Sequence, residues 1–588
     1  MSGKRIKLVS SAAIIFIALL PVFGGNFYVT LFNYIGIYAL VVLGLVLLTG
    51  AGGLISFGQA AFVGIGAYST AFITTKFGLS PWIGLPVALI VSGLVAVILG
   101  LVTLHLSGHY LALLTIAWGM TIFLIFGNLQ FLGGHSGITD IPPLSVFGIS
   151  LESNTRYFYL IWPLVGLAML LANWLLESRQ GRAIRALRGG KVLAESLGIN
   201  VFRLRLAVFT TAALLAGLAG WLYAHMQRYI GPTPFDLSVG IEFLLMAVIG
   251  GAGSVGGALL GAIVITSLRT ILQDFLPLVT SRAGNLEIVV YGCLFILMLQ
   301  YARSGLIGLF VPYLGSGAPV HPSAATSLPR RTLPQKGTAL LRVEELTKRF
   351  GGLVAVDRVD FSVSAGEIVG LIGPNGAGKS TIFNLISGAL SPSNGRIVFG
   401  ETELSRVRPQ MLVQLGLART FQHVKLRPNM TTIENVMLGA YTRTKTGFIC
   451  GSLRLDRRIE AGVYNEALLQ LRRVGLEAKA DELVGSLPLG QQRVVEIARA
   501  LATDPMLIIL DEPAAGLRRA EKRQLSELLK SLRESGMALL LVEHDMDFVM
   551  GLVDRVVMVD FGKKLAEGLP QEIRNNPIVQ EAYLGSVA

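Results

Sequence analysis

The stretch Gly373-Pro-Asn-Gly-Ala-Gly-Lys-Ser-Thr381 decides the fold of the C-terminal half of the chain. It follows a short apolar run, Glu367-Ile-Val-Gly-Leu-Ile372, and precedes a helical run, Ile382-Phe-Asn-Leu-Ile386. A strand, GxxxxGK[ST] and a helix in this order predict a phosphate-binding loop. The glycines let successive backbone N–H groups turn toward phosphate oxygens, and the helix adds the positive end of its dipole. This half is therefore predicted to be an α/β P-loop domain.

The side chains of this loop have separate expected roles. Lys379 would reach the β and γ phosphates of ATP, and Ser380 would ligate Mg²⁺. The expected ATP-binding residues of the loop are Gly373, Pro374, Asn375, Gly376, Ala377, Gly378, Lys379, Ser380 and Thr381.

A second apolar run, Met506-Leu-Ile-Ile-Leu510, ends in Asp511 and Glu512. A strand that ends in a carboxylate places Asp511 where it could hold the water shell of Mg²⁺. Glu512 is then placed to orient or deprotonate the attacking water. Alone, such a run would be an ordinary surface turn, but beside a phosphate-binding loop it favours catalysis.

The composition of the whole chain points to a membrane. Hydrophobic residues make up 52% of the 588 residues, glycine adds 68 more, and only 15% are charged, against about 25% in soluble proteins. These values exclude a disordered chain, a collagen-like repeat and an ordinary cytosolic enzyme. The net charge of +13 fits basic cytoplasmic loops better than nucleic-acid binding, because the basic residues stand at the edges of apolar runs. Cys293 lies inside an apolar run and Cys450 lies far away in a polar region, so no disulfide is predicted.

The N-terminal half carries few charges and many apolar runs. From Leu8 to Leu176 the only charged residues are Lys76, Asp140, Glu152 and Arg156. Runs long enough to cross about 30 Å of hydrocarbon begin near Leu8, Phe27, Gly53, Pro81, His109 and Tyr157. Further runs cover Leu206–Tyr229, Ile241–Leu268 and Ile288–Leu299. No charged pair in these runs marks a substrate pocket, and Glu242 lies near the end of one.

The distribution of basic residues predicts which side of the membrane each end of the apolar runs faces. The loop from Glu177 to Arg205 contains seven basic and two acidic residues, so it is predicted to be cytoplasmic. For the C-terminal half to lie on the same side, the run interrupted by Gly250–Gly257 should contribute two segments. We therefore expect about ten spans in residues 1–314.

Two glycine-rich stretches, Gly52–Gly64 and Gly250–Gly257, admit two interpretations. Small residues let membrane helices pack closely, or they break helices beside a translocation path. Close packing is the favoured interpretation. Residues 315–338, rich in proline and serine, are expected to be a flexible linker to the domain at 339–588.

Residues 340–588 resemble the ATP-binding cassette family. Phe350 lies upstream of the phosphate-binding loop, where the family stacks an aromatic ring on adenine. Gln422, in Arg419-Thr-Phe-Gln422, is similar to the Q-loop glutamine, which the family uses near the γ-phosphate, Mg²⁺ and the membrane domain. His544, in Val542-Glu-His-Asp545, resembles the switch histidine. The resemblance implies catalytic roles for Glu512, His544 and Gln422, and a Mg²⁺ site at Ser380, Gln422 and Asp511.

The signature motif of the family has a counterpart here with two departures. It is formed by Leu487, Pro488, Leu489, Gly490 and Gln491. The family usually has Ser and Gly where Pro488 and Leu489 stand, and Asp or Asn where Arg518 stands. Because a signature completes the ATP site of the partner cassette, these changes would affect the partner's site. The region between Gln422 and Leu487, about 423–487, would be the helical subdomain, and Thr431-Thr-Ile-Glu434 fits a capping box there.

The membrane half resembles LivM-type permeases of branched-chain amino acid importers. The resemblance rests on Gly53–Tyr68, Gly133–Ile138, Gly181–Ala186 with Gly198-Ile-Asn200, and Glu242–Gly251. The cassette is similar to the LivG-type ATPase of the same systems, whose signatures often lack the usual Ser. The chain therefore resembles a LivM–LivG fusion: a multi-span α-helical membrane domain, type II importer-like, followed by an ATP-binding cassette.

The resemblance implies partners and a location. One permease and one cassette are half a transporter, so a LivH-type permease, a LivF-type ATPase and an extracytoplasmic solute-binding protein are expected in the bacterial cytoplasmic membrane; a homodimer is the less favoured assembly. Lys191 to Ile199, within the loop at about 177–205, is the candidate coupling helix. The expected substrates are branched-chain or other hydrophobic amino acids, with urea, short amides or aromatic acids as alternatives. An exporter or flippase, or a merely tethered ATPase, fits less well with about ten spans and short cytoplasmic loops.

Overall fold

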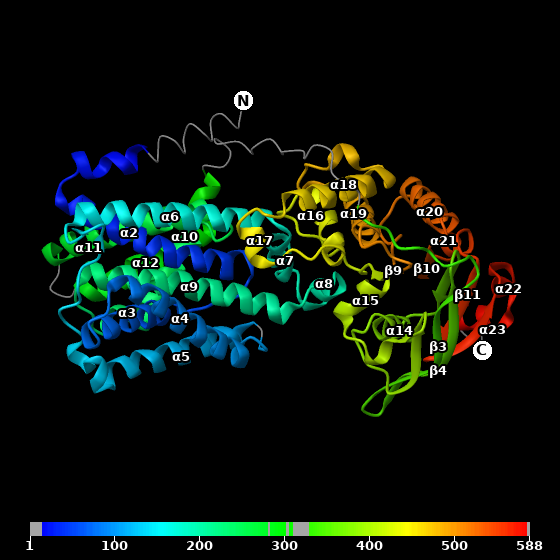
Figure 1. The fold of residues 1–588 in the computed structure, drawn as a ribbon. Helices are drawn as coiled ribbons and strands as arrows, with labels where there is room; N and C mark the ends of the chain where they lie inside the picture. The colour runs from blue at the N-terminus through cyan, green and yellow to red at the C-terminus, as the bar shows by residue number, and fades with distance from the viewer. Residues whose placement is uncertain (1–14, 107, 280–282, 302–304, 310–327, 585–588) are drawn as a thin grey trace. The chain divides into compact units, whose positions relative to one another are not determined.

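The computed structural model describes residues 15–106, 108–279, 283–301, 305–309 and 328–584 (Figure 1). The chain forms two compact units. The membrane unit consists of Met1–Arg188, Phe202–Val320 and Phe448–Leu455. The cassette unit consists of Gly189–Val201, His321–Gly447 and Asp456–Ala588. Each unit thus includes a short segment that the sequence analysis placed in the other half.

The membrane unit is built from long apolar helices. Six helices are long and apolar enough to cross a membrane by length and composition, counting only the described residues. They are α2 (Asn26–Leu45) continued by the π-helix η1 (Val46–Ala51), α4 (Pro81–Thr103), α5 (His109–Asn128), α6 (Asn154–Glu177), α9 (Val201–Gln227) and α11 (Val255–Val279). Other helices of the unit include α3 (Gln59–Lys76), α7 (Arg179–Leu187), α10 (Leu237–Gly250), α12 (Ala283–Tyr301) and α17 (Phe448–Ser452). The predicted run that begins near Leu8 lies partly outside the described residues.

The glycine-rich stretch between α10 and α11 both breaks a helix and packs closely. Gly251 has a φ of +120° and ends α10, so the run is two helices, as predicted. A Cβ on Gly250 would lie 1.9 Å from the carbonyl oxygen of Gly257, and one on Gly261 would lie 1.8 Å from that of Met246. Only glycine permits this approach of two backbones.

The other glycine-rich stretch also interrupts a helical run. Residues 52–58 are irregular and separate η1 from α3. Gly64, in α3, faces the ring of Phe126, because a Cβ there would lie 2.5 Å from Phe126 Cε2. Helix interruption and close packing therefore coexist in both stretches.

The expectation that the spans contain no charged pair is wrong. Arg269 in α11 donates from Nη1 to Glu242 Oε2 in α10 at 3.2 Å. Hydropathy along one run cannot show this pair, because its members belong to two helices that meet only after the chain turns at Gly251.

The cassette unit contains two sheets. The six-stranded sheet has the order β12-β11-β5-β10-β9-β8 and is parallel except for β12. Its strands are β5 (Ile368–Ile372), β8 (Leu417–Arg419), β9 (Leu507–Asp511), β10 (Ala538–Val542), β11 (Arg555–Asp560) and β12 (Lys563–Gly568). The antiparallel sheet has the order β4-β3-β6-β7, formed by β3 (Ala339–Phe350), β4 (Leu353–Ser364), β6 (Asn394–Phe399) and β7 (Thr402–Glu403). The central strands β5, β9 and β10 are wholly buried, as expected for strands covered on both faces.

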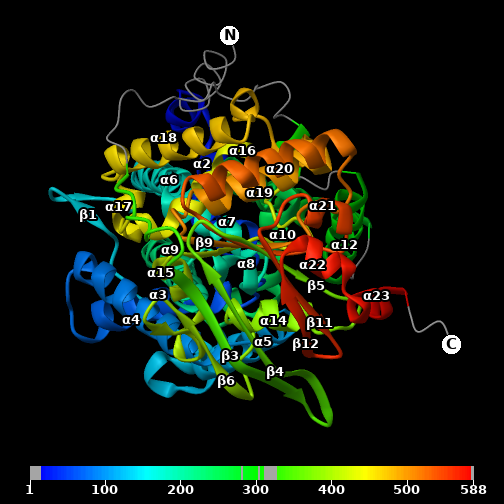
Figure 2. The ribbon, with the colours of Figure 1, turned by 90° about the vertical axis from the view of Figure 1, so that its right-hand side faces the viewer.

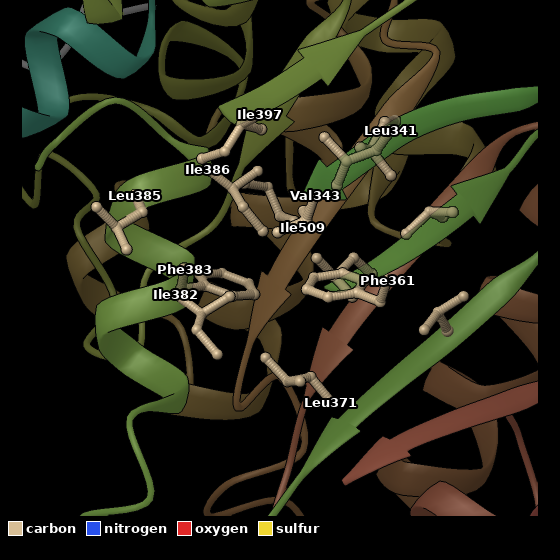
Figure 3. Packing of buried hydrophobic residues seen from close by; sticks show 14 of the residues in the cluster. Leu341, Val343, Phe361, Leu371, Ile382, Phe383, Leu385, Ile386, Ile397 and Ile509 are labelled. Carbon is tan, nitrogen blue, oxygen red and sulfur yellow. The ribbon is translucent and has the colours of Figure 1, made fainter. Parts of the chain in front are cut away.

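One hydrophobic core joins the two sheets to α14 (Lys379–Ile386), the helix after the phosphate-binding loop (Figure 3). Phe383 and Ile386 of α14 meet Phe361 of β4 and Ile509 of β9 in this cluster. The loop is therefore fixed at both ends, by a buried strand before it and a packed helix after it.

A second set of helices has its own core. It includes α16 (Thr432–Met437), α18 (Arg457–Arg473) and α19 (Leu489–Leu501), which Figure 2 shows in yellow to orange. Two other helices pack into different clusters: α15 (Pro409–Leu415) joins the cluster of α14 through Leu412, and α20 (Arg519–Glu534) joins a third cluster through Leu525, Leu529 and Leu532. Residues of α16, α18 and α19 form one hydrophobic cluster; α16 and α18 lie within residues 423–487, and α19 follows that range. The capping box is confirmed: the Thr431 side chain accepts from Glu434 N, and the Glu434 side chain accepts from Thr431 N.

The described end of the predicted linker is fastened to the cassette. Arg331 donates from its guanidinium to the carbonyl oxygens of Val413 at 2.9 Å and Asp504 at 2.7 Å, and its backbone N–H donates to Asp504 Oδ2 at 2.5 Å. Arg443 donates to the carbonyl oxygen of Pro329 at 2.9 Å. Residues 315–327 of the predicted linker lie outside the described part of the chain.

Candidate ATP-hydrolysis site

Parallel pairing brings the predicted site residues to one edge of a sheet. In the six-stranded sheet β5 and β9 both flank β10, and β8 flanks β9. The phosphate-binding loop follows β5, Glu512 follows β9, His544 lies two residues after β10, and Gln422 lies three residues after β8. Because the carboxyl ends of parallel strands share an edge, residues far apart in sequence meet there.

The phosphate-binding loop depends on glycine at two close backbone contacts. A Cβ on Gly373 would lie 2.0 Å from the carbonyl oxygen of Val559, and one on Gly378, at φ +98°, would lie 2.5 Å from that of Ala355. Asn375, Gly376 and Ser380 are exposed. The loop thus leaves its outer rim open to an anion.

Lys379 is held inside the loop. Its side chain is 9% exposed, and its Nζ donates to the carbonyl oxygens of Gly373 and Pro374, both at 2.7 Å. Burial lowers the pKa of Lys379, and the charges of Glu512 and Asp560 oppose that shift. The ammonium group is therefore positioned where phosphate oxygens would meet the backbone N–H groups.

Asp511 has a basic partner that sequence reasoning missed. Arg419 Nη2 lies 3.7 Å from Asp511 Oδ2, and Arg419 also donates to Asn384 Oδ1 at 2.9 Å and Ser387 Oγ at 2.5 Å. Burial raises the pKa of Asp511, and Arg419 opposes this shift. Arg419 therefore favours the charged form of the carboxylate expected near Mg²⁺.

The guanidinium of Arg419 is also packed between aromatic rings. It lies 5.5 Å from the ring centre of Phe383 and 5.2 Å from that of Phe421. Only its position directly before Thr420-Phe-Gln422 could have drawn attention to this residue, because nothing in the sequence links it to Asp511, 92 residues later.

Glu512 and His544 face each other across the site. His544 Nδ1 lies 3.7 Å from Glu512 Oε1. Glu512 has a φ of +45°, and its N–H donates to the carbonyl oxygen of Val542 at 2.9 Å. A non-glycine residue in this left-handed region is held there by its surroundings. The carboxylate is thereby turned away from the strand that carries it, toward the neighbouring histidine.

Arg493 joins the signature helix to the hydrolysis site. It donates from Nη1 to the carbonyl oxygen of Glu512 at 2.8 Å and from Nη2 to that of Gln422 at 3.2 Å. Arg493 follows the signature motif by two residues in the sequence. A movement of α19 would therefore reach the backbone of Glu512 and of the exposed Gln422 directly.

The altered signature forms the first turn of α19. Pro488 is the N-cap residue and Leu489 is the first helical residue. The side chain of Leu489 is 52% exposed, and a Cβ on Gly490 would lie 2.6 Å from Glu521 Oε1. Gln491, the next residue, lies in the same turn. The free N–H groups of this turn form an anion-binding end, although the cap itself offers no hydroxyl.

Phe350 and Arg518 are two further residues that the sequence analysis singled out. Phe350 ends β3 and is 45% exposed, with Lys348 Nζ 5.2 Å from its ring centre. An exposed ring of this kind can stack on a nucleotide base. Arg518 precedes α20, and its N–H donates to Glu521 Oε2 at 2.8 Å.

The possible metal ligands at this site fit Mg²⁺ bound together with a nucleotide better than a metal ion held by protein side chains alone. Among the described residues no group of three or more His, Cys, Asp or Glu side chains could hold a metal ion. Mg²⁺ is usually held by few protein ligands together with phosphate oxygens and water. The exposed hydroxyl of Ser380 and the carboxylate of Asp511, at the same sheet edge, meet that requirement.

Comparisons with known proteins agree with both units. Residues 27–299 match the family described as branched-chain amino acid transport system / permease component, residues 356–515 match the ABC transporter family, and residues 563–588 match the branched-chain amino acid ATP-binding cassette transporter family.

Three relatives of the cassette are similar over nearly their whole length. The high-affinity branched-chain amino acid transport ATP-binding protein LivG is 45% identical in Salmonella typhimurium and 44% identical in Escherichia coli, over 249 residues, which are 42% of this chain and 98% of the relative. The corresponding protein BraF of Pseudomonas aeruginosa is 41% identical with the same coverage. The chain therefore belongs to the branched-chain amino acid family of ATP-binding cassette transporters, with a permease and an ATP-hydrolysing cassette fused in one polypeptide.

Proposed function

We propose that this chain is a fused permease–ATPase half-transporter that imports branched-chain or other hydrophobic amino acids by ATP hydrolysis. The observation that carries the proposal is that one polypeptide contains a permease of the branched-chain family and a cassette with a complete phosphate-binding edge. The remaining parts would be a LivH-type permease, a LivF-type ATPase and an extracytoplasmic solute-binding protein. The bilayer would be the bacterial cytoplasmic membrane.

In the proposed topology the permease crosses the membrane about ten times. The six long apolar helices would be joined by α3, α10, α12 and a first segment that begins near Leu8. An even number of crossings places the basic loop at 177–205 and the cassette on the cytoplasmic side.

The proposed hydrolysis follows from the contacts at the sheet edge. Lys379 would bind the β and γ phosphates, Phe350 would stack on adenine, and Ser380, Asp511 and Gln422 would hold Mg²⁺. When bound, Mg²⁺ neutralises charge on the phosphate oxygens. Glu512 accepts a proton from the attacking water or orients that water, and His544 lies 3.7 Å away to stabilise the γ-phosphate as charge develops.

The expected test is ATP-driven uptake by the complete complex in sealed vesicles. With the binding protein outside and MgATP inside, radiolabelled leucine should accumulate, and labelled urea or benzoate should not compete with it. Accumulation of urea, an amide or an aromatic acid in place of leucine would contradict the proposed substrate. Outward movement of substrate would contradict import.

The coupling helix is proposed to be α8 (Lys191–Ser196), which belongs to the cassette unit. Leu193 and Leu197 are buried, and a Cβ on Gly198 would lie 2.2 Å from Thr442 Cγ2. Burial raises the pKa of Glu195, and the neighbouring Lys191 opposes this shift. This helix is thus seated among cassette residues rather than solvated as a loop.

A cleft beside α8 leads toward the hydrolysis site. Lys191 and Glu195 line this cleft together with Ser387, Pro409 and Arg419. Because Arg419 also lies 3.7 Å from Asp511, one side chain both lines the cleft and meets the carboxylate expected near Mg²⁺. This is the proposed route by which movement of the permease and the state of the nucleotide affect each other.

Leu197→Trp is therefore expected to uncouple transport from hydrolysis. Leu197 is 4% exposed, so a larger ring would displace the helix. Leucine moved per ATP hydrolysed should fall at least about threefold, a change that corresponds to ~0.7 kcal/mol. Glu534→Trp, at an exposed end of α20, is the control. An unchanged ratio in Leu197→Trp would place the coupling contact elsewhere.

A further inference from the structure

The membrane unit contains a polar cluster that the proposed hydrolysis does not use. Its centre is the ion pair between Glu242 in α10 and Arg269 in α11, at 3.2 Å. Three tyrosines surround it: Tyr34 and Tyr38 from α2, and Tyr223 from α9. Each lies within electrostatic range of Arg269. Four helices that are separated in sequence thus contribute to one cluster.

The aromatic rings of the cluster contact one another in sequence. The ring centres of Tyr34 and Tyr38 are 6.0 Å apart, those of Tyr34 and Tyr223 are 6.5 Å apart, and Tyr38 meets Phe243 edge-on at 5.3 Å. The three tyrosines are half-buried. The Arg269 side chain is 34% exposed. The guanidinium of Arg269 is therefore the more accessible member of the ion pair, since the Glu242 side chain is only 11% exposed.

The ion pair is not needed to hold α10 against α11. Gly250, Gly257 and Gly261 already bring the two backbones into direct contact. Removing two charges from water costs more than a well-packed apolar pair would, and ionisable residues within membrane segments usually mark a functional site. This argues that the charges serve a ligand rather than the packing.

Tyr223 and Glu242 lie near the ends of α9 and α10 that face each other along the chain, whereas Tyr38 and Arg269 lie about midway along α2 and α11. Tyr223 is four residues before the end of α9, and Glu242 is five residues after the start of α10, which are depths of about 6 and 8 Å. Tyr34 neighbours Asn33, whose Nδ2 donates to the carbonyl oxygen of Asn154 at the start of α6. Since α6 ends at Glu177 beside the basic loop, these ends face the side opposite that loop.

We propose that Glu242, Arg269, Tyr34, Tyr38 and Tyr223 form an entry site for the zwitterionic head group of an α-amino acid on the extracytoplasmic side of the membrane. The guanidinium of Arg269 receives the carboxylate, the carboxylate of Glu242 receives the ammonium group, and the tyrosine rings receive the ammonium face and the aliphatic side chain. The ligand replaces one ion pair by two, so no net charge enters the site. This assignment rests on the proposed function and narrows its substrate to molecules with both charges, excluding urea and neutral amides.

The test uses the complete complex in sealed vesicles with its binding protein, comparing the native chain with Glu242→Gln/Arg269→Gln. Two glutamines can still hydrogen-bond to each other, so helix packing is kept while both charges are lost. Leucine moved per ATP hydrolysed should fall about tenfold to a hundredfold, as expected for loss of charge-assisted bonds. Arg269→Lys, which keeps the positive charge, should lie between the native and the double variant.

The matched control is Glu152→Gln, which removes a different ion pair of the same unit, that with Arg228, outside the cluster. It should transport leucine as the native chain does. The amount of assembled complex recovered from membranes shows whether each variant folds. Tyr38→Phe, which keeps the ring, should retain more leucine transport than Tyr38→Ala.

Equal leucine transport per ATP by the double glutamine variant and the native complex would overturn the entry site while leaving amino acid import intact. A native complex that hydrolyses ATP but moves urea or an amide instead of leucine would overturn both the entry site and the proposed substrate. A loss of transport by Glu152→Gln equal to that of the double variant would also overturn the assignment, because any ion pair would then have the same effect.

Discussion

Glu512→Gln should stop steady-state ATP hydrolysis while leaving MgATP binding intact. The substitution removes the proton acceptor but keeps the side-chain length at a residue whose φ of +45° is fixed by its neighbours. Lys379, Ser380 and Asp511 remain in place. Since general-base catalysis contributes roughly 10²–10⁴-fold, the turnover of this site should fall by about that factor. Phosphate release and filter binding of labelled ATP on the same preparation separate the two effects.

The control for this variant is Glu527→Gln, a carboxylate of α20 whose side chain is 70% exposed. It should hydrolyse ATP at the native rate. Near-native turnover by Glu512→Gln in the assembled complex would remove Glu512 from the proposed mechanism. Loss of ATP binding together with hydrolysis would show that the substitution damages the loop instead.

Lys379→Ala should reduce hydrolysis far more than the matching lysine change in the partner ATPase. The ATP site at Lys379 would be completed by the signature motif of the partner ATPase. The ATP bound by the partner would instead face Pro488 and the exposed Leu489. The cap at Pro488 has no hydroxyl for a γ-phosphate. Removing Lys379, whose Nζ lies 2.7 Å from two loop carbonyls, should cost about tenfold or more in the rate of the complex.

The expected difference between the two ATP sites is tested separately by Pro488→Ser, which introduces a hydroxyl at the N-cap of α19. This change should raise the rate of the partner site and leave the site at Lys379 unchanged. Equal losses from the two lysine substitutions, measured on the same reconstituted complex, would show that the altered signature has no catalytic effect.

The sequence predicts those parts of the protein whose structure is determined by residues close together along the chain. The phosphate-binding loop, the Thr431–Glu434 capping box and the division of the glycine-rich run into α10 and α11 depend on local spacing. Their physical causes, backbone turning, cap hydrogen bonds and helix interruption, act over a few residues.

The contacts that sequence could not show join distant segments. Arg419 meets Asp511 because β8 pairs with β9, and Arg493 reaches Gln422 and Glu512 because α19 packs beside the same edge. The Glu242–Arg269 pair forms because Gly250 and Gly261 let two helices touch. Each depends on packing between elements, which hydropathy and motif spacing do not encode.

The fastening of Arg331 has a consequence for synthesis on the ribosome. Its most distant partner, Asp504, follows 173 residues later, so at about 5–20 residues per second the arginine waits roughly 10–35 s before that partner is translated. During this interval the preceding helices can enter the bilayer while the segment after them is still unattached. The cassette closes onto Arg331 only after Asp504 has been translated, so this contact forms late in synthesis. Because both parts belong to one polypeptide, each cassette is made together with one membrane part.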